Sequence, residues 1–251
     1  MKRILIRADD LGYSEGVNYG IAKSMIDGVI CSVGLMSNMP AAEHGVQLVK
    51  GHGFCLGQHT NICAGTPLTD PERIPSLVDE NGNFKSSKVY RSAEEDFVVL
   101  EEAILEVEAQ YQRFVELTGQ QPQHFGSHAV KSDNFFRAVE IVAERHGLPF
   151  LGSSLKGGPI LFRHTKLYTA MDSMKPDYDP FESLKAAAMR DYGEDGCCMF
   201  VCHPGYLDED ILQNSSLTRP RPLEVAMSID PRTKQWLDEN QVKLVTFNDL
   251  P

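Results

Sequence analysis

Two adjacent carboxylates, Asp9 and Asp10, follow the short apolar run Ile4-Leu5-Ile6 after two intervening residues. The run predicts a buried β-strand, so the acidic pair lies where the strand stops and the chain turns toward a helix. Neighbouring negative charges repel and are costly to bury unless a positive group lies beside them. A divalent metal ion is the simplest such partner. The structural alternative is a helix cap followed by a solvated acid.

Three histidines, His59, His128 and His203, each end another strand-like run. An aspartate with two histidines is a common metal-binding set that leaves positions open for water and substrate. A metal held in this way lowers the pKa of bound water and polarises a carbonyl group. A second carboxylate can then act as a general base and another histidine as a general acid. A lone histidine is more often a hydrogen-bonded structural residue, so the hypothesis depends on their joint placement.

Composition excludes some classes of partner. The chain has 251 residues, 42% of them hydrophobic, and a formal net charge of -11. No basic stripe is available to neutralise nucleic-acid phosphates or to bind an anionic membrane. A neutral or amino-bearing small molecule is an easier partner for so acidic a protein.

No apolar stretch approaches the length of a transmembrane helix, and the run behind Lys2 and Arg3 is too short for a secretory signal. The six cysteines form no CxxC pair, and several lie within apolar strand-like runs. This use of cysteine is typical of buried, reduced thiols inside cells. We therefore expect a cytoplasmic protein.

Strands and helices alternate along the chain, which favours a mostly parallel sheet. We predict strands at Ile4–Ile6, Val29–Met36, Phe54–Thr60, His124–Ser127, Leu148–Leu151, Cys197–Cys202 and Val242–Phe247. We predict helices at Ser14–Asp27, Pro40–Lys50, Ser92–Gly119, Asn134–His146 and Pro180–Tyr192, and from Asp230-Pro231 onward. The length and pattern suit a single α/β domain over residues 1–251 with a distorted (β/α) barrel. An open doubly wound sheet is the alternative.

Two segments are too irregular for this repeat. Asn61–Arg91 carries three prolines and the turn Asn81-Gly82-Asn83, and Gly152–Asp179 carries Gly157-Gly158-Pro159. Loops of this length in a compact domain are usually functional or mobile. Because both follow predicted strands, we interpret them as walls or lids of a substrate site. Dimerisation is the competing role, and a homodimer is one expectation.

Several motifs resemble the YdjC-like carbohydrate deacetylases, which include the chitooligosaccharide deacetylases. Arg7-Ala8-Asp9-Asp10-Leu11-Gly12 is similar to the family's opening Asn-Ala-Asp-Asp-Phe-Gly. The resemblance continues through Leu56-Gly57-Gln58-His59 and ends with Cys202-His203-Pro204-Gly205-Tyr206. It covers nearly the whole chain in the same order.

The resemblance implies a barrel-like deacetylase fold, a divalent ion and removal of acetyl groups from N-acetylated mono- or oligosaccharides. His59 and His128 match the two metal histidines, and His203 matches the late histidine that could serve as the acid. By analogy with polysaccharide deacetylases, Asp10 is the metal ligand and Asp9 the base. The family ion is usually assigned as Mg²⁺, whereas imidazole ligands favour Zn²⁺ or another transition ion.

One stretch departs from the family pattern. The family typically reads His-Leu-Asp-Ser-His around the second metal histidine, but this chain has Gly126 where the aspartate is expected, and the histidines that usually follow are missing. Loss of a carboxylate beside the ligands can cost about 10–100-fold in metal affinity or activity. Two alternatives therefore stay open. They are a non-catalytic sugar-binding or regulatory protein, and a metal-dependent phosphoesterase.

Overall fold

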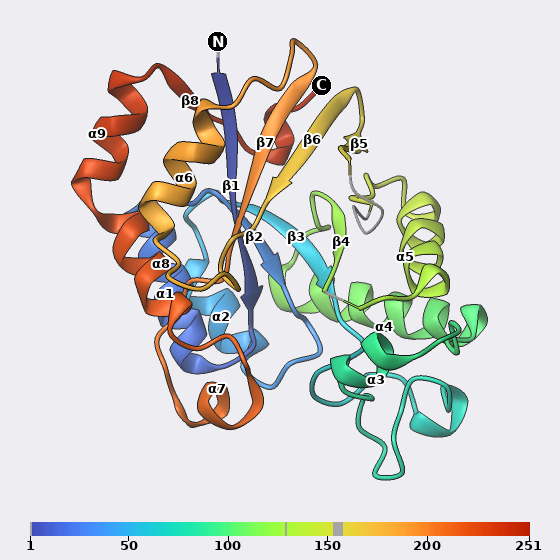
Figure 1. Cartoon of the computed structure of the whole chain (residues 1–251). Coiled ribbons are helices and arrows are strands. Elements are labelled where there is room, and N and C mark those ends of the chain that lie inside the picture. Colours follow the sequence, from blue (N-terminus) through green and yellow to red (C-terminus); the bar gives the residue numbers. More distant parts are fainter. Residues whose placement is uncertain (1, 129, 153–157) are drawn as a thin grey trace.

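The computed structural model describes residues 2–128, 130–152 and 158–251, and it forms an α/β fold around one sheet (Figure 1). The strand order is β4-β3-β2-β1-β7-β6-β5, and β8 also pairs with β1. The strands are β1 (Lys2–Leu11), β2 (Ser32–Leu35), β3 (Cys55–Thr60), β4 (Phe125–Ser127), β5 (Ile160–Phe162), β6 (Thr165–Ala170), β7 (Gly196–Cys202) and β8 (Val242–Leu244). Among these pairings only β5 with β6 is antiparallel.

Helices follow one another around the sheet, as in a barrel (Figure 1). The helices are α1 (Glu15–Ile26), α2 (Ala42–Val49), α3 (Ser87–Ser92), α4 (Leu100–Thr118), α5 (Asp133–Arg145), α6 (Pro180–Met189), α7 (Glu209–Asn214), α8 (Pro220–Ile229) and α9 (Pro231–Glu239), with short 3₁₀ helices at Pro71–Arg73 and Phe247–Asp249. Contacts run in sequence from α6 to α8, α1, α2, α4 and α5. The structure thus agrees with the barrel-like prediction, although the sheet stays open between β4 and β5.

Alternation along the strands separates two apolar layers. Ile4 and Ile6 of β1 belong to the core between sheet and helices, whereas Leu5 belongs to a separate core on the other face. That second core also contains Cys55 of β3 and Val201 of β7. Successive side chains of a strand point to opposite faces. The inner face of the sheet is therefore lined by every second residue of β1, β3 and β7.

Local sequence signals explain several element ends. Ser14 caps α1 by accepting a hydrogen bond from the Val17 backbone N–H. Gly119 ends α4 with a φ of 72°, a left-handed conformation that glycine adopts without steric cost. Asp230 caps α9, which begins at Pro231 as predicted.

The prediction that Ser92 caps the long helix is wrong. Ser92 is the last residue of α3, and α4 begins only at Leu100. The acidic residues between them have another use, because the Asp96 carboxylate accepts hydrogen bonds from Ser132 Oγ at 2.9 Å and from the Asn134 N–H at 2.9 Å. The acid therefore caps the start of α5 instead of its own helix.

Two further corrections concern the second half of the chain. The segment Gly152–Asp179 was expected to be irregular, but it contributes β5 and β6 to the sheet. The predicted strand Leu148–Leu151 is reduced to one bridge between Phe125 and Phe150. Helix α8 was not predicted. Residues 153–157 of the expected loop lie outside the described residues.

No helix in the described part of the chain is long and apolar enough to cross a membrane. All six cysteines are free, and five of them are buried.

Candidate metal centre and active site

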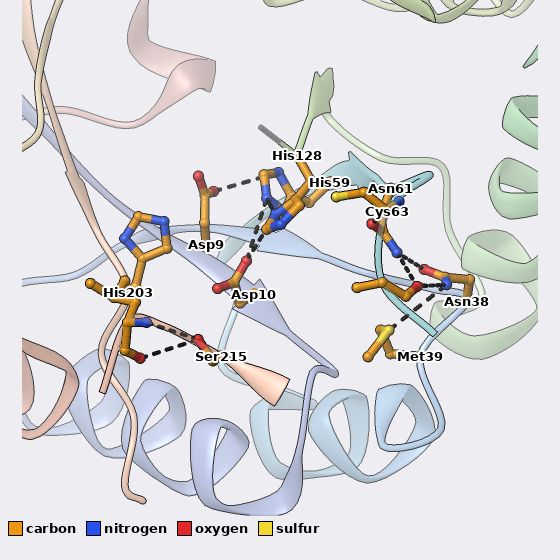
Figure 2. A network of polar contacts seen from close by, with 12 residues as sticks. Asp9, Asp10, Asn38, Met39, His59, Asn61, Cys63, His128, His203 and Ser215 are labelled. Atoms are coloured by element: carbon orange, nitrogen blue, oxygen red, sulfur yellow. Dashed lines mark hydrogen bonds and ion pairs between the residues drawn. The ribbon is translucent and has the colours of Figure 1, made fainter. Parts of the chain in front are cut away.

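The predicted site residues meet at one edge of the sheet. Asp9 and Asp10 lie near the end of β1, His59 in β3, His128 just after β4 and His203 just after β7. These strands run parallel, so their carboxyl ends share an edge. Figure 2 shows the two aspartates between His203 on one side and the other two histidines on the opposite side. Sequence reasoning therefore predicted which side chains converge.

Asp10, His59 and His128 form a cluster with one ligand atom each, all within 4.8 Å of one another. Asp10 Oδ1 lies 3.6 Å from His59 Nε2 and 3.3 Å from His128 Nδ1. The two ring nitrogens are 3.1 Å apart. Donors that share one ion at about 2.0–2.2 Å lie roughly 3–3.6 Å from each other, so the spacing fits a metal-binding set.

Asp10 reaches this cluster because the backbone of β1 is irregular at its end. A regular strand would turn Asp9 and Asp10 to opposite faces. Here Asp10 has a φ of 77°, and the register with β2 shifts between Ala8 and Leu11. Such a left-handed conformation is uncommon for a residue with a side chain and is typical of functional sites. It brings both carboxylates to the same side of the sheet.

Each aspartate has its own arginine. Arg221 Nη2 of α8 donates to Asp10 Oδ2 at 2.9 Å, and Arg7 Nε donates to Asp9 Oδ1. Burial would raise the pKa of Asp10, but contacts with His128 and His59 and the charge of Arg221 hold that pKa well below its usual range. Asp10 is therefore a carboxylate at neutral pH. One of its oxygens is bound to Arg221, while Oδ1, facing the histidines, has no hydrogen-bond partner among the described residues.

This orphaned oxygen is the test of whether a metal fits. A buried carboxylate oxygen without a partner is costly, and a cation between it and two imidazoles would remove that cost. Burial disfavours the charged form of His128, but the neighbouring Cys63 and Asp10 raise its pKa well above the usual value. The surroundings of these donors thus favour positive charge. Asp10, His59 and His128 fit a divalent ion.

Asp9 lies behind this cluster and is held from one side. Its Oδ1 pairs with Arg7 and lies 3.8 Å from His59 Nδ1. No hydrogen bond in the described part of the chain reaches the other oxygen, Oδ2. Only 8% of the Asp9 side chain is exposed. A carboxylate with one oxygen fixed and one free is suited to accept a proton in a defined direction.

His203 is anchored through its backbone rather than its ring. Its N–H donates to Glu224 Oε2 at 2.6 Å, and its carbonyl accepts from Arg221 Nη1 at 3.4 Å. The ring atom Nδ1 has no partner within the described residues. Burial lowers the pKa of His203 to about 4, although Asp10 and Asp9 oppose this shift. The ring is therefore neutral at pH 7.

Sequence reasoning missed Arg221 and Glu224. Both lie on α8, three residues apart, and both are buried. Residues at this spacing share a helix face. Burial raises the pKa of Glu224 to about 7, because its partners His203, Tyr178 and Arg221 only partly offset the loss of water. Pro220 at the first helical position was the available signal for this helix.

A cavity of about 650 Å³ opens beside the cluster. Asp10, His128 and His203 line its floor, together with Arg221. The two long segments expected to form walls both contribute to it. From the first come Cys63, Ala64, Gly65, Asn83, Phe84, Ser86, Ser87 and Arg91, and from the second Met171, Ser173 and Met174. The cavity is large enough for a sugar-sized ligand.

Comparison with known proteins agrees with this geometry. The profile of the family described as YdjC-like protein matches residues 3–239. The chain belongs to this family. Carbohydrate deacetylase 2 of Listeria innocua is 34% identical over 261 residues, covering 99% of each chain. The chitooligosaccharide deacetylase of Serratia marcescens is 31% identical, also covering 99% of each chain.

A crystal structure from Enterococcus faecalis, described as that of a candidate cellobiose-phosphate cleavage protein, has the same fold. Its TM-score is 0.81 at 23% identity, and the match covers 98% of both chains. The YdjC-like chain therefore has its fold in common with a solved structure along nearly its whole length.

Proposed function

We propose that this YdjC-like protein is a metal-dependent hydrolase, one carbohydrate deacetylase-like domain that removes acetyl groups from N-acetylated mono- or oligosaccharides. The observation that carries the proposal is the unpartnered Asp10 Oδ1 facing His59 and His128 on the floor of a sugar-sized cavity. The names of the curated relatives, carbohydrate and chitooligosaccharide deacetylase, support the substrate class.

Asp10, His59 and His128 would hold the ion, which would polarise the acetyl carbonyl and lower the pKa of a bound water. Asp9 would take the proton of the attacking water, since its Oδ2 is free while Arg7 fixes Oδ1. His203 would protonate the leaving amine from the other side of the aspartates. Amine expulsion needs this proton because an amide anion is a very poor leaving group.

The test is acetate release from N-acetylglucosamine and short chitooligosaccharides, measured before and after removal of metals and after their return. Release that requires an added divalent ion supports the proposal. If the protein binds the sugar but releases no acetate with any of the added metals, the result would instead favour a sugar-binding or regulatory protein. Release of phosphate from sugar phosphates would favour the phosphoesterase alternative.

We propose that the site accepts several divalent ions, with a preference for zinc or a similar transition ion over magnesium. Two imidazoles and one carboxylate are the reason, since magnesium prefers oxygen ligands. Metal content of the purified protein and titration with Mg²⁺, Zn²⁺ and Co²⁺ test this preference.

Two wider proposals remain from the sequence. We propose a cytoplasmic location, supported by six free cysteines, and a homodimer. The exposed side chains of Leu161, Met171 and Met174 on β5 and after β6 offer apolar surface for such a contact. Cell fractionation and sedimentation analysis test the two proposals separately.

A further inference from the structure

Two glycines leave space for neighbouring side chains on the inner face of the sheet. A Cβ on Gly34 of β2 would stand 2.9 Å from Asp9 Oδ1 and 2.9 Å from His59 Cβ. A Cβ on Gly126 of β4 would stand 3.3 Å from Arg7 Nη2. The lack of side chains on β2 and β4 therefore makes room for groups that reach over from β1 and β3.

Arg7 reaches into the space beside Gly126 and is almost fully buried. Its Nε donates to Asp9 Oδ1, and its Nη2 lies 3.0 Å from His59 Nδ1. The guanidinium reaches Gly126, which is the register partner of His59 on β4. The arginine thus ends beside a strand position that has no side chain.

The Arg7 guanidinium has opposite consequences for its two neighbours, His59 and Asp9. A metal-binding histidine usually donates its second ring N–H to an acceptor. A guanidinium has only donors, so Arg7 opposes that arrangement at His59 Nδ1, and its charge also opposes a cation nearby. For Asp9 the same group is favourable, because an ion pair fixes one oxygen and leaves the other free.

We propose that Arg7 is a positioning residue for the base Asp9, that its guanidinium occupies the space left free by the missing side chain of Gly126, and that its charge and N–H donors weaken metal binding while they order the base. The role of the base rests on the proposed deacetylase function. The effect on metal affinity does not. A purely structural ion pair would make both properties fall together when it is removed.

The first experiment is Arg7→Asn in the full chain, with Arg3→Asn as the matched control. Arg3 lies on the same strand and face, but among the described residues its guanidinium donates only to the backbone carbonyls of Glu194 and Gly196. With saturating metal we expect Arg7→Asn to lower kcat for acetate release by about 10²-fold, the scale of a misplaced general base. We expect Co²⁺ or Zn²⁺ to bind it about tenfold more tightly.

Opposite changes in turnover and metal affinity support the proposal, and any other combination overturns it. Arg7→Lys provides the test if Arg7→Asn does not fold. The single ammonium group of this lysine cannot reach both Asp9 and His59, so it should pair with Asp9. The variant should then keep kcat within about tenfold of the wild type and should bind metal more tightly than the wild type.

A double-mutant cycle tests whether Arg7 occupies the place at Gly126. Gly126→Asp brings a carboxylate to the guanidinium and should draw it away from Asp9, which lowers kcat about tenfold. In the Arg7→Asn background the same change should alter kcat less than about twofold. Equal losses in both backgrounds would overturn the claim.

Metal titration of the wild type, Arg7→Asn and Arg3→Asn needs no substrate, so it stands apart from the proposed function. If the wild type releases no acetate from any N-acetylated sugar, the deacetylase proposal fails. The proposal for Arg7 then fails only if Arg7→Asn does not bind Co²⁺ or Zn²⁺ more tightly than both the wild type and Arg3→Asn.

Discussion

The two sides of the site are built differently. On the ligand side, Asp10 Oδ1, His59 Nε2 and His128 Nδ1 lie within 3.6 Å of one another and converge on one point. On the acid side, His203 is held by its backbone, through Glu224 and Arg221, while its ring Nδ1 has no partner in the described chain. The first arrangement suits a fixed ligand set. The second suits a ring that must gain and lose a proton.

The largest effect is expected from Asp10→Asn. This change removes the carboxylate charge that faces the two imidazoles and that pairs with Arg221, so metal affinity and acetate release should both fall to background. Metal content measured by mass spectrometry, next to an acetate assay, checks this. If the Asp10→Asn variant keeps its metal, Asp10 is not a required metal ligand and the contrast between the two sides of the site fails.

Asp9→Asn is the matched control, because Asp9 is one residue away and is also buried. We expect it to keep the metal and to lower kcat by about 10²–10⁴-fold, because only the base is lost. The same two measurements check it. If Asp9→Asn loses metal while Asp10→Asn keeps it, the two roles are reversed.

His203→Ala tests the acid side. The ligand cluster does not use this ring, so the metal should remain bound while turnover of sugar acetamides falls about 10²-fold. An activated acetate ester, whose leaving group needs little protonation, should lose far less. Equal losses on the two substrates would indicate a role in positioning or folding.

The pH dependence sharpens the same point. Burial lowers the pKa of His203 to about 4. If the free enzyme must carry the proton on this ring, only a small fraction is active at pH 7, and kcat/KM should rise as the pH falls toward 5. A pH–rate profile of the wild type checks this. A flat profile would mean that the proton reaches the ring only after substrate binds.

The smallest effect concerns the support beneath His203. The pKa of Glu224 is raised by burial to about 7, from an ordinary value of 4.5. Because the pKa of Glu224 is higher in the folded state, ionisation of this carboxyl opposes folding. The contribution of Glu224 to the free energy of unfolding therefore declines as the pH rises from about 4.5 to 7. Relative to Glu224→Gln, the free energy of unfolding of the wild type should fall by about 1–3 kcal/mol across this pH range. Thermal melts of both proteins between pH 5 and 8 measure it, and parallel curves would contradict the shift.

Sequence reasoning was reliable where the signals were local. The apolar runs before Asp9, His59, His128 and His203 predicted parallel strands, and parallel strands bring their carboxyl ends to one edge whatever the details of the fold. The caps at Ser14 and Gly119 needed only neighbouring backbone groups. For these reasons the convergence of these side chains could be predicted without coordinates, whereas the choice of Asp10, His59 and His128 as metal ligands came from the resemblance to the family.

Only the tertiary structure decided what surrounds that set. Arg221 comes from a helix 211 residues beyond Asp10, and Arg7 of β1 meets Gly126 of β4 across the two strands that lie between them. No periodicity encodes such contacts, because they depend on strand order and register. The amino-acid sequence therefore determined which donors gather at the sheet edge. Long-range packing determined the charge balance at Asp10, whose partner Arg221 comes from a distant helix, whereas Asp9 pairs with Arg7 two residues earlier on the same strand.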